Sequence, residues 1–261
     1  MGYRGAIFDV DGVLVATPHE RAWRETLQWL FDNEWQDVLA KTRYRPDSFT
    51  GAVYQEHLSG KPRPEGALAT LLHFGVPGAE ERALRYAEVK QAFVVELIER
   101  GEFTAFHDAL RFILEVKAAG IQTAAASSSK NAHLFLRQIP IDTFSRAAGK
   151  TYDFVKSGTT LLDLFDIDVS GRDFAQGKPH PEIFETAAAE LGLSPDVCFV
   201  VEDAVVGIVA AKAAKIAALG VARSDDMELL QEAGADETVV TLDEVSIAAL
   251  STGSLAKREA G

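Results

Sequence analysis

Cysteine, methionine and long apolar segments are all scarce in this sequence of 261 residues. Cys198 is the only cysteine, so no disulfide can form within the chain, and we expect a reducing, cytoplasmic compartment. No apolar run approaches the ~20 residues that a membrane-spanning helix needs. The first residues lead directly into a predicted core strand, so we expect no signal peptide and no membrane association.

Basic residues are outnumbered by acidic ones. The chain has 26 Lys and Arg against 39 Asp and Glu, which gives a formal net charge of −13. Phosphate backbones are held by clusters of Lys and Arg, so this balance argues against a nucleic-acid partner. A phosphorylated small molecule stays compatible, because a pocket can be locally cationic or hold a metal inside an acidic protein. We also expect a monomer, although no residue pattern bears on oligomeric state.

The length favours two domains, on the usual ~100–200 residues per domain. An apolar run at residues 3–9 ends in acids, which is typical of a buried parallel strand whose carboxyl end delivers side chains to a site. No convincing strand follows until residue 103. Apolar residues instead recur at helical spacing in residues 20–31, 48–58, 64–74 and 80–100.

Strands and helices alternate after residue 103. The predicted strands are 121–127, 197–201, 216–220 and 237–240, and the predicted helices are 108–119, 181–191 and 205–214. This alternation indicates an α/β fold with a doubly wound parallel sheet. Residues 145–160 are expected to form an extended loop. We therefore predict a core domain of residues 1–14 and 103–250, an inserted helical lid of residues 15–102, and a frayed tail of residues 251–261.

The first chemical signal is a pair of acids at the end of the first predicted strand. Asp9 and Asp11 are one residue apart, and Gly12 permits the chain to turn at once, so both carboxylates can reach one site. One acid can then attack while the other handles a proton. Taken alone, the pair could equally be a solvated acidic turn.

Three further segments follow at the ends of other predicted elements. Ser127 and Ser129 provide hydroxyls at the end of a second apolar strand and at the start of a helix, where backbone N–H groups can bind an anion, although a plain helix cap would look the same. Lys178 precedes a helix, where a lone lysine would usually be a surface residue. Glu202 and Asp203 end another strand, and two acid pairs side by side would repel unless a hard cation such as Mg²⁺ lay between them.

All four segments fall at the carboxyl ends of predicted strands, where open α/β sheets bind ligands. Together they resemble the four motifs of the haloacid dehalogenase superfamily, over essentially the whole chain. The resemblance implies that Asp9 is the nucleophile, Asp11 the general acid and base, and Ser127 and Lys178 the residues that hold phosphate. It also implies an Mg²⁺ cofactor, with Glu202 and Asp203 as ligands beside Asp9 and Asp11. Ser129 and Asn131 join the predicted substrate-binding residues.

The second acid favours phosphoryl transfer. Dehalogenases of the superfamily generally lack an Asp at the position of Asp11, whereas phosphatases and mutases need it to protonate the leaving oxygen. The chemistry agrees with this implication, because a phosphoryl group repels a carboxylate until Mg²⁺ and Lys178 neutralise charge.

The helical insert resembles the cap of the β-phosphoglucomutase branch. The resemblance implies that five cap residues bind a phosphorylated sugar: Thr17, His19, Trp23, Arg63 and Lys90. Each has a plainer alternative, since Trp23 lies at core spacing, His19 lies near a helix start, and the two cations could be solvated. The stretch from Asp11 to His19 is shorter than in that branch, Ala16 replaces an acid, and residues 145–160 look inserted.

These departures leave several functions open. A mutase that interconverts hexose 1-phosphate and 6-phosphate is narrowly favoured over a phosphatase that hydrolyses a sugar phosphate or similar monoester. A receiver-type phosphoacceptor domain would be about half this length and would lack a lid. A non-catalytic phosphosugar sensor would have little use for the intact pair of Asp9 and Asp11.

Overall fold

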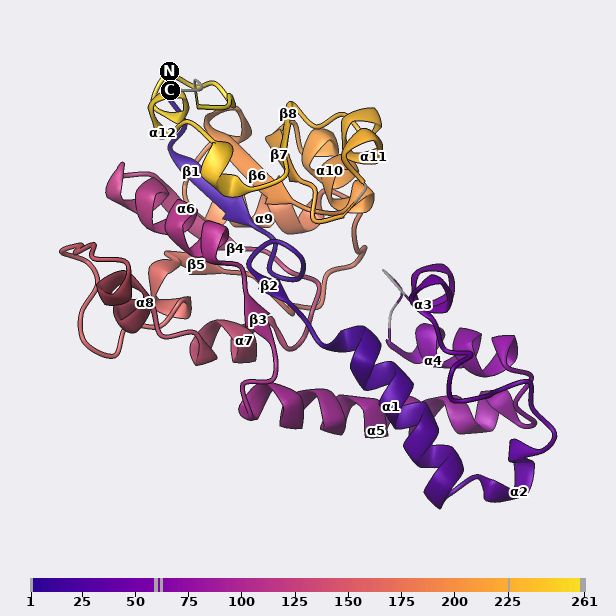
Figure 1. Cartoon of the computed structure of the whole chain (residues 1–261). Coiled ribbons are helices and arrows are strands. Elements are labelled where there is room, and N and C mark those ends of the chain that lie inside the picture. The colour runs from indigo at the N-terminus through magenta and orange to yellow at the C-terminus, as the bar shows by residue number, and fades with distance from the viewer. Residues whose placement is uncertain (1, 59–60, 62, 225, 259–261) are drawn as a thin grey trace. The chain divides into compact units, whose positions relative to one another are not determined.

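The computed structural model describes residues 2–58, 61, 63–224 and 226–258 (Figure 1). The chain divides into two compact units, which are described separately below. One unit runs to Ala16 and resumes at Phe103, and the other spans Thr17–Glu102. The fold is α/β, with a parallel sheet in the first unit and an inserted helical cap domain as the second. The predicted fold class is confirmed.

A six-stranded sheet forms the centre of the first unit, in the order β5-β4-β1-β6-β7-β8. Every neighbouring pair is parallel. Phe8 is paired with Ala125 on one side and with Val201 on the other, so β1, β4 and β6 end at one edge. The strands are β1 (Gly5–Phe8), β4 (Gln122–Ala125), β5 (Ile167–Asp168), β6 (Cys198–Glu202), β7 (Ala217–Val221) and β8 (Glu237–Val239).

Helices cover both faces of this sheet (Figure 1). Successive strand residues point to opposite faces, so Ile7 and Phe8 of β1 pack in different layers. Ile7 lies in a buried cluster with Phe184 of α9 and Ile208 of α10. Phe8 instead meets Phe112 of α6 at a ring-centroid distance of 6.1 Å. The core helices are α6 (His107–Ala118), α7 (Ala132–Gln138), α8 (Ile141–Ala147), α9 (Glu182–Glu190), α10 (Val205–Ala213), α11 (Met227–Glu232) and α12 (Ile247–Leu250).

Two expectations for this unit need correction. The loop predicted for residues 145–160 begins inside α8, because Ile141 and Ser145 supply a short buried face to that helix. The tail is not frayed over residues 251–258. The backbone N–H of Ser246 donates to Ala256, and that of Arg258 donates to Glu244, so the chain returns to pair with residues near 245.

Helices are the only regular secondary structure among the described residues of the inserted unit. Its core is aromatic, with Trp23, Phe31 and Tyr86 buried between helices. The Trp23 and Tyr86 rings meet edge to face at 4.8 Å. Within the described part of both units, no helix is both long and apolar enough to span a membrane. The helices are α1 (His19–Asn33), α2 (Gln36–Leu39), α3 (Gly51–His57), α4 (Arg63–His73) and α5 (Ala79–Glu99).

A two-stranded antiparallel ladder stands where the chain leaves and re-enters the first unit. β2 (Val15–Ala16) pairs with β3 (Thr104–Ala105). The expectation of no strand between residues 13 and 102 is therefore wrong at β2. Two residues are too few to give a sequence periodicity, and the partner strand lies about ninety residues away in the sequence.

Candidate functional site

The acid pair sits on a tight turn directly after β1. The backbone N–H of Asp9 still donates to Val201 of β6, whereas residues beyond it fold back through a bond from Leu14 to the Val10 carbonyl. Gly12 has a φ of +83°, in the left-handed region that favours glycine. The turn thus holds Asp9 and Asp11 at the carboxyl edge of the sheet.

Asp203 lies against this turn. A Cβ added to Gly12 would fall 1.8 Å from Asp203 Oδ2, so a side chain at position 12 would require the Asp203 carboxylate to move. The neighbouring strands β1 and β6 bring the two segments together, since Asp203 follows β6 immediately. The structure therefore places the second acid pair beside the first.

Lys178 joins the two acid pairs. Its Nζ lies 2.6 Å from Asp9 Oδ1 and 2.5 Å from Glu202 Oε1. The same ammonium lies 4.8 Å from the centre of the Phe184 ring. With a side chain only 8% exposed, Lys178 is not the surface residue of the alternative interpretation.

Both oxygens of Glu202 have partners. Oε1 accepts from Lys178, and Oε2 accepts from the backbone N–H groups of Asp203 and Ala204, each at 3.0 Å. Gly207 in α10 makes room for this carboxylate, because a Cβ there would fall 1.8 Å from Oε1. Glu202 is thus held by the backbone through one oxygen and contacts the Lys178 ammonium through the other.

Ser127 is buried beside Asp11. Its Oγ donates to Asp11 Oδ2 at 3.4 Å and accepts from the backbone N–H of Ser129 at 3.1 Å. Ser129 Oγ in turn accepts from the N–H of Asn131, so these hydroxyls also shape the loop before α7. Ser170, which the sequence did not single out, accepts from the N–H of Ser127 and fixes it from the side of β5.

Burial and crowding shift the pKa values of the charged groups. Burial raises the pKa of Asp9 to about 7, with Glu202 and Asp11 adding to the shift and Lys178 opposing it. Burial also raises the pKa of Asp203 well above its ordinary value, and Glu202 and Asp9 raise it further. For Lys178, burial alone would lower the pKa, but the two carboxylates outweigh it and raise the pKa. One lysine thus faces an excess of negative charge.

This excess fits a divalent cation. Among the residues that the structure describes, no three acidic, His or Cys side chains gather closely enough to hold a metal by themselves. Mg²⁺ does not require such a cage, because it is usually bound by one or two carboxylates and keeps waters and substrate phosphate as its other ligands. Asp9 and Asp203 have the oxygen chemistry for that arrangement.

Three of the predicted cap residues, His19, Trp23 and Lys90, come together within their own unit. Lys90 Nζ lies 3.4 Å from His19 Nδ1 and 5.0 Å from the centre of the Trp23 ring. Burial lowers the pKa of His19 to about 3, and the charges of Lys90 and Arg63 add to this. Lys90 is only 4% exposed, so it is no solvated surface charge. Trp23 packs in the cap core as well, and Thr17 is the first residue of the unit.

A residue at the site that the sequence did not reveal is Arg223, which follows β7. Its Nε donates to the carbonyl of Gly12, inside the turn that carries the first acid pair. The sequence contains one indication of its position, because Arg223 is the first polar side chain after a core strand, as Asp9 and Ser127 are. The contact with Gly12 could not be predicted, because the two residues are about 210 positions apart in the sequence.

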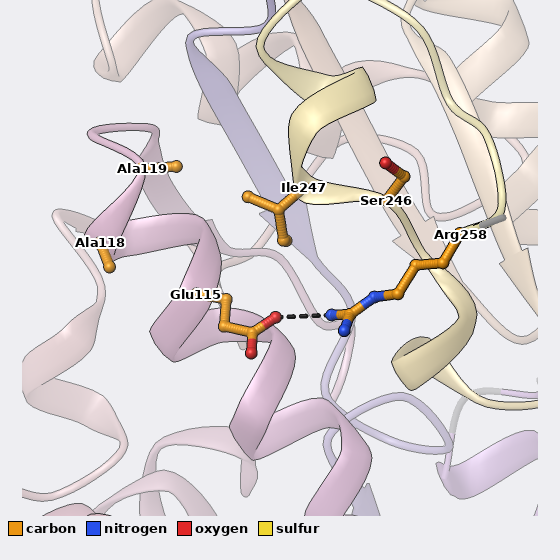
Figure 2. Close-up of a pocket in the computed structure, with 6 residues that line it drawn as sticks. All are labelled: Glu115, Ala118, Ala119, Ser246, Ile247 and Arg258. Carbon is orange, nitrogen blue, oxygen red and sulfur yellow. Dashed lines mark hydrogen bonds and ion pairs between the residues drawn. The ribbon is translucent and has the colours of Figure 1, made fainter. Parts of the chain in front are cut away.

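A separate pocket of about 470 Å³ lies away from these residues (Figure 2). Figure 2 shows Glu115 of α6 pointing toward Arg258, and their charged atoms are 2.7 Å apart. The backbone N–H of Tyr3, just before β1, donates to Leu250 of α12, so this region lies at the amino ends of the strands. The pocket is therefore at the opposite edge from the acid pairs. Its lining residues are Glu115, Ala118, Ala119, Ser246, Ile247 and Arg258.

Comparison with known proteins agrees with this arrangement. The haloacid dehalogenase-like hydrolase family matches residues 3–215, and the chain belongs to that family. A β-phosphoglucomutase of Mycobacterium bovis is 28% identical over 258 residues, covering 93% of this chain and 91% of that protein.

Two solved structures share the fold along nearly the full length. A β-phosphoglucomutase of Pyrococcus sp. strain ST 04 is 32% identical, with a TM-score of 0.68, over 96% of this chain and 99% of its own. CbbY of Rhodobacter sphaeroides, solved with phosphate, is 25% identical, with a TM-score of 0.67, over 92% and 95%. The chain is thus an enzyme of the phosphatase and phosphomutase class, a class whose members generally use Mg²⁺.

Proposed function

We propose that this chain is a Mg²⁺-dependent phosphosugar mutase of the β-phosphoglucomutase type, which interconverts a hexose 1-phosphate and 6-phosphate through a bisphosphate. One observation supports the phosphoryl-transfer chemistry on which the proposal rests. Asp9 is held by Lys178 at the carboxyl edge of the sheet, beside Asp11 and with Asp203 against the same turn. The proposed nucleophile, proton carrier and oxygen ligand for a cation thus lie together.

In the first half of the reaction, an oxygen of Asp9 attacks one phosphorus of the hexose bisphosphate while the bond from that phosphorus to the sugar oxygen breaks, which leaves a hexose monophosphate. Asp11 donates a proton to that leaving oxygen. In the second half, the free hydroxyl of a bound hexose 1-phosphate attacks the phosphoaspartate and gives its proton to Asp11, which forms the bisphosphate again. The Asp9 carboxylate is released, and both acids return to their starting states.

Charge neutralisation falls to the residues around Asp9. Lys178, oriented by Glu202, and the hydroxyl of Ser127 would hold the phosphoryl oxygens. Asp9 and Asp203 would hold Mg²⁺, which when bound offsets the negative charge that otherwise keeps phosphate away. The predicted metal roles of Glu202 and of the Asp11 side chain stay predictions, and we favour the Lys178 partnership for Glu202.

The cap residues would bind the part of the substrate that does not react. His19, Lys90 and Arg63 supply donors suited to a second phosphate or to sugar hydroxyls, and Thr17 begins the same unit. Ser129 and Asn131 would support the phosphate side of the site. Trp23 contributes by packing under the Lys90 ammonium.

A phosphatase is the second candidate. The stretch of chain from Asp11 to His19, which leads into the cap, favours it. Ala16 stands where the mutase branch commonly has an acid, and the stretch to His19 is short. A mutase must keep the phosphoenzyme from water while the intermediate turns over, whereas a phosphatase need only admit water. A small change in lid fit could convert one outcome into the other.

The deciding experiment supplies purified protein with Mg²⁺, β-glucose 1-phosphate and a trace of glucose 1,6-bisphosphate. Glucose 6-phosphate and inorganic phosphate are then followed separately. Formation of glucose 6-phosphate without stoichiometric phosphate supports the mutase, and release of phosphate alone supports the phosphatase. Absence of turnover of any phosphate ester would refute both and favour a sensor. Asp9→Asn, which is nearly isosteric but cannot attack, is the matched control.

A further inference from the structure

The guanidinium of Arg223 donates three hydrogen bonds and stacks on an aromatic ring. Its Nε donates to the Gly12 carbonyl at 3.1 Å, and its Nη2 donates to the Val13 carbonyl at 2.9 Å. Nη1 donates to Asp108 Oδ2 at 2.8 Å. The guanidinium carbon lies 3.9 Å from the centre of the Phe106 ring.

The acid that anchors Arg223 is itself fixed. Asp108, near the start of α6, accepts from Arg223, from Thr241 Oγ1 and from the backbone N–H of Leu242. Burial would raise the pKa of Asp108, but these donors outweigh it and hold the pKa below its ordinary value. Both side chains are mostly enclosed, at 17% exposed for Arg223 and 10% for Asp108.

The two carbonyl groups that Arg223 holds belong to the residues directly after Asp11. A further bond, from the Phe106 N–H to the Leu14 carbonyl, ties the same turn to the segment on which Arg223 stacks. Asp11 lies on this turn, and Arg223 fixes the two residues that follow it. The orientation of the Asp11 carboxylate therefore depends on Arg223. A planar guanidinium can satisfy three acceptors at once, whereas a lysine ammonium cannot reproduce that fork.

We propose that Arg223 is a positioning residue for proton transfer by Asp11, because it fixes the main chain at Gly12 and Val13. This assignment rests on the proposed function, in which Asp11 donates the proton to the leaving oxygen. A general acid must lie within hydrogen-bond reach of that oxygen, and a displacement of about 1 Å can cost about 100-fold in rate. Loss of Arg223 should therefore slow proton-dependent steps more than proton-independent ones.

The test compares two phosphoryl donors for Asp9. Acetyl phosphate releases acetate, which needs no proton to leave, whereas a sugar phosphate releases an alkoxide that does. Wild type, Arg223→Gln and Arg223→Lys are mixed with Mg²⁺ and acetyl phosphate, or with glucose 1,6-bisphosphate or β-glucose 1-phosphate, whichever labels wild type faster. Phosphoenzyme is then quantified by acid quench and mass spectrometry.

We expect Arg223→Gln to slow labelling by the sugar phosphate about 10–100-fold and labelling by acetyl phosphate less than about 3-fold. Arg223→Lys should resemble Arg223→Gln. Arg111→Gln is the control, because Arg111 also joins α6 to the segment near residue 243, through Asp243, without touching the catalytic turn. It should leave both rates unchanged.

Asp108→Asn supplies the same comparison if Arg223→Gln fails to fold, since it leaves Arg223 in place and weakens its anchor. Equal slowing with both donors, or no slowing with either, would overturn the assignment while leaving the proposed function intact. If acetyl phosphate labelled wild type and the sugar phosphates did not, the assignment would also be overturned. Proton donation to a sugar oxygen would then not belong to the reaction of this chain. Wild type that neither donor labels would overturn the proposed function itself.

Discussion

The carboxylate of Asp203 fills the space in which a side chain at position 12 would begin, with Oδ2 only 1.8 Å from the place of a Cβ on Gly12. Gly12→Ala should therefore push Asp203 away from the turn that carries Asp11. We expect kcat to fall at least about 100-fold, because the reacting groups lose their alignment. The affinity for Mg²⁺, measured as the concentration that gives half-maximal activity, should weaken as well.

Gly101→Ala separates the clash from backbone strain. Gly101 also has a positive φ, +69°, but a Cβ there would have no neighbour within 4 Å. Both substitutions carry the left-handed penalty of about 1–2 kcal/mol, which urea unfolding measures. Equal activities for the two variants would show that the contact between Asp203 and the turn has no catalytic importance.

The two acids at the carboxyl end of β6, Glu202 and Asp203, should respond differently to neutralisation. Asp203→Asn removes a proposed Mg²⁺ ligand, so we expect weaker Mg²⁺ binding and a smaller rise of Tm when Mg²⁺ is added. Glu202→Gln disturbs the contact with Lys178, so it should lower kcat and leave Mg²⁺ affinity nearly unchanged. Mg²⁺ titrations of activity and of Tm provide both measurements.

Asp173→Asn is the reference variant for this pair, since its side chain is 95% exposed and pairs only with Lys130 among the described contacts. It should match wild type. If Glu202→Gln weakened Mg²⁺ binding as much as Asp203→Asn, Glu202 would be a ligand of the metal, as its sequence position alone suggested.

His19 should make the cap sensitive to acid. Burial lowers the pKa of its ring to about 3, so the folded chain keeps it neutral, whereas the unfolded chain protonates it below about pH 6.5. The unfolded state therefore binds more protons, and stability falls as the pH drops from about 6.5 toward 3. Because His19 is only partly enclosed, we expect a loss of about 1–2 kcal/mol between pH 7 and pH 4.5.

Urea unfolding of wild type and His19→Gln at these two pH values tests this dependence. The variant should lose less stability than wild type on acidification. His133→Gln serves for comparison, because its side chain is 51% exposed on the surface of the first unit. An identical acid response of wild type and His19→Gln would contradict an imidazole that the folded cap keeps neutral.

Much of the site could be predicted because it follows from strand order. Asp9, Ser127 and Asp203 each follow an apolar strand, and the carboxyl ends of parallel strands share an edge. The sequence therefore indicated which side chains gather, but could not give their pairings. That Glu202 binds Lys178, while Asp203 lies against Gly12, depends on side-chain directions fixed only by the packed structure.

The features that sequence reasoning missed have different physical causes. β5 is two residues long, too short for any periodicity, and its place in the sheet comes from pairing with β4. The tail was expected to fray because it is a chain terminus, yet the N–H of Arg258 donates to Glu244. Arg223 carried no motif, and its contact with the catalytic turn exists only in three dimensions.

The most direct test of the account asks which residue becomes phosphorylated. Wild type, Asp9→Asn and Asp11→Asn are incubated with Mg²⁺ and acetyl phosphate, quenched in acid, digested and sequenced by mass spectrometry. We predict one phosphoryl group on Asp9 in wild type and in Asp11→Asn, and none in Asp9→Asn. A phosphoryl group on any other residue, or turnover of phosphate esters by Asp9→Asn at the wild-type rate, would contradict it.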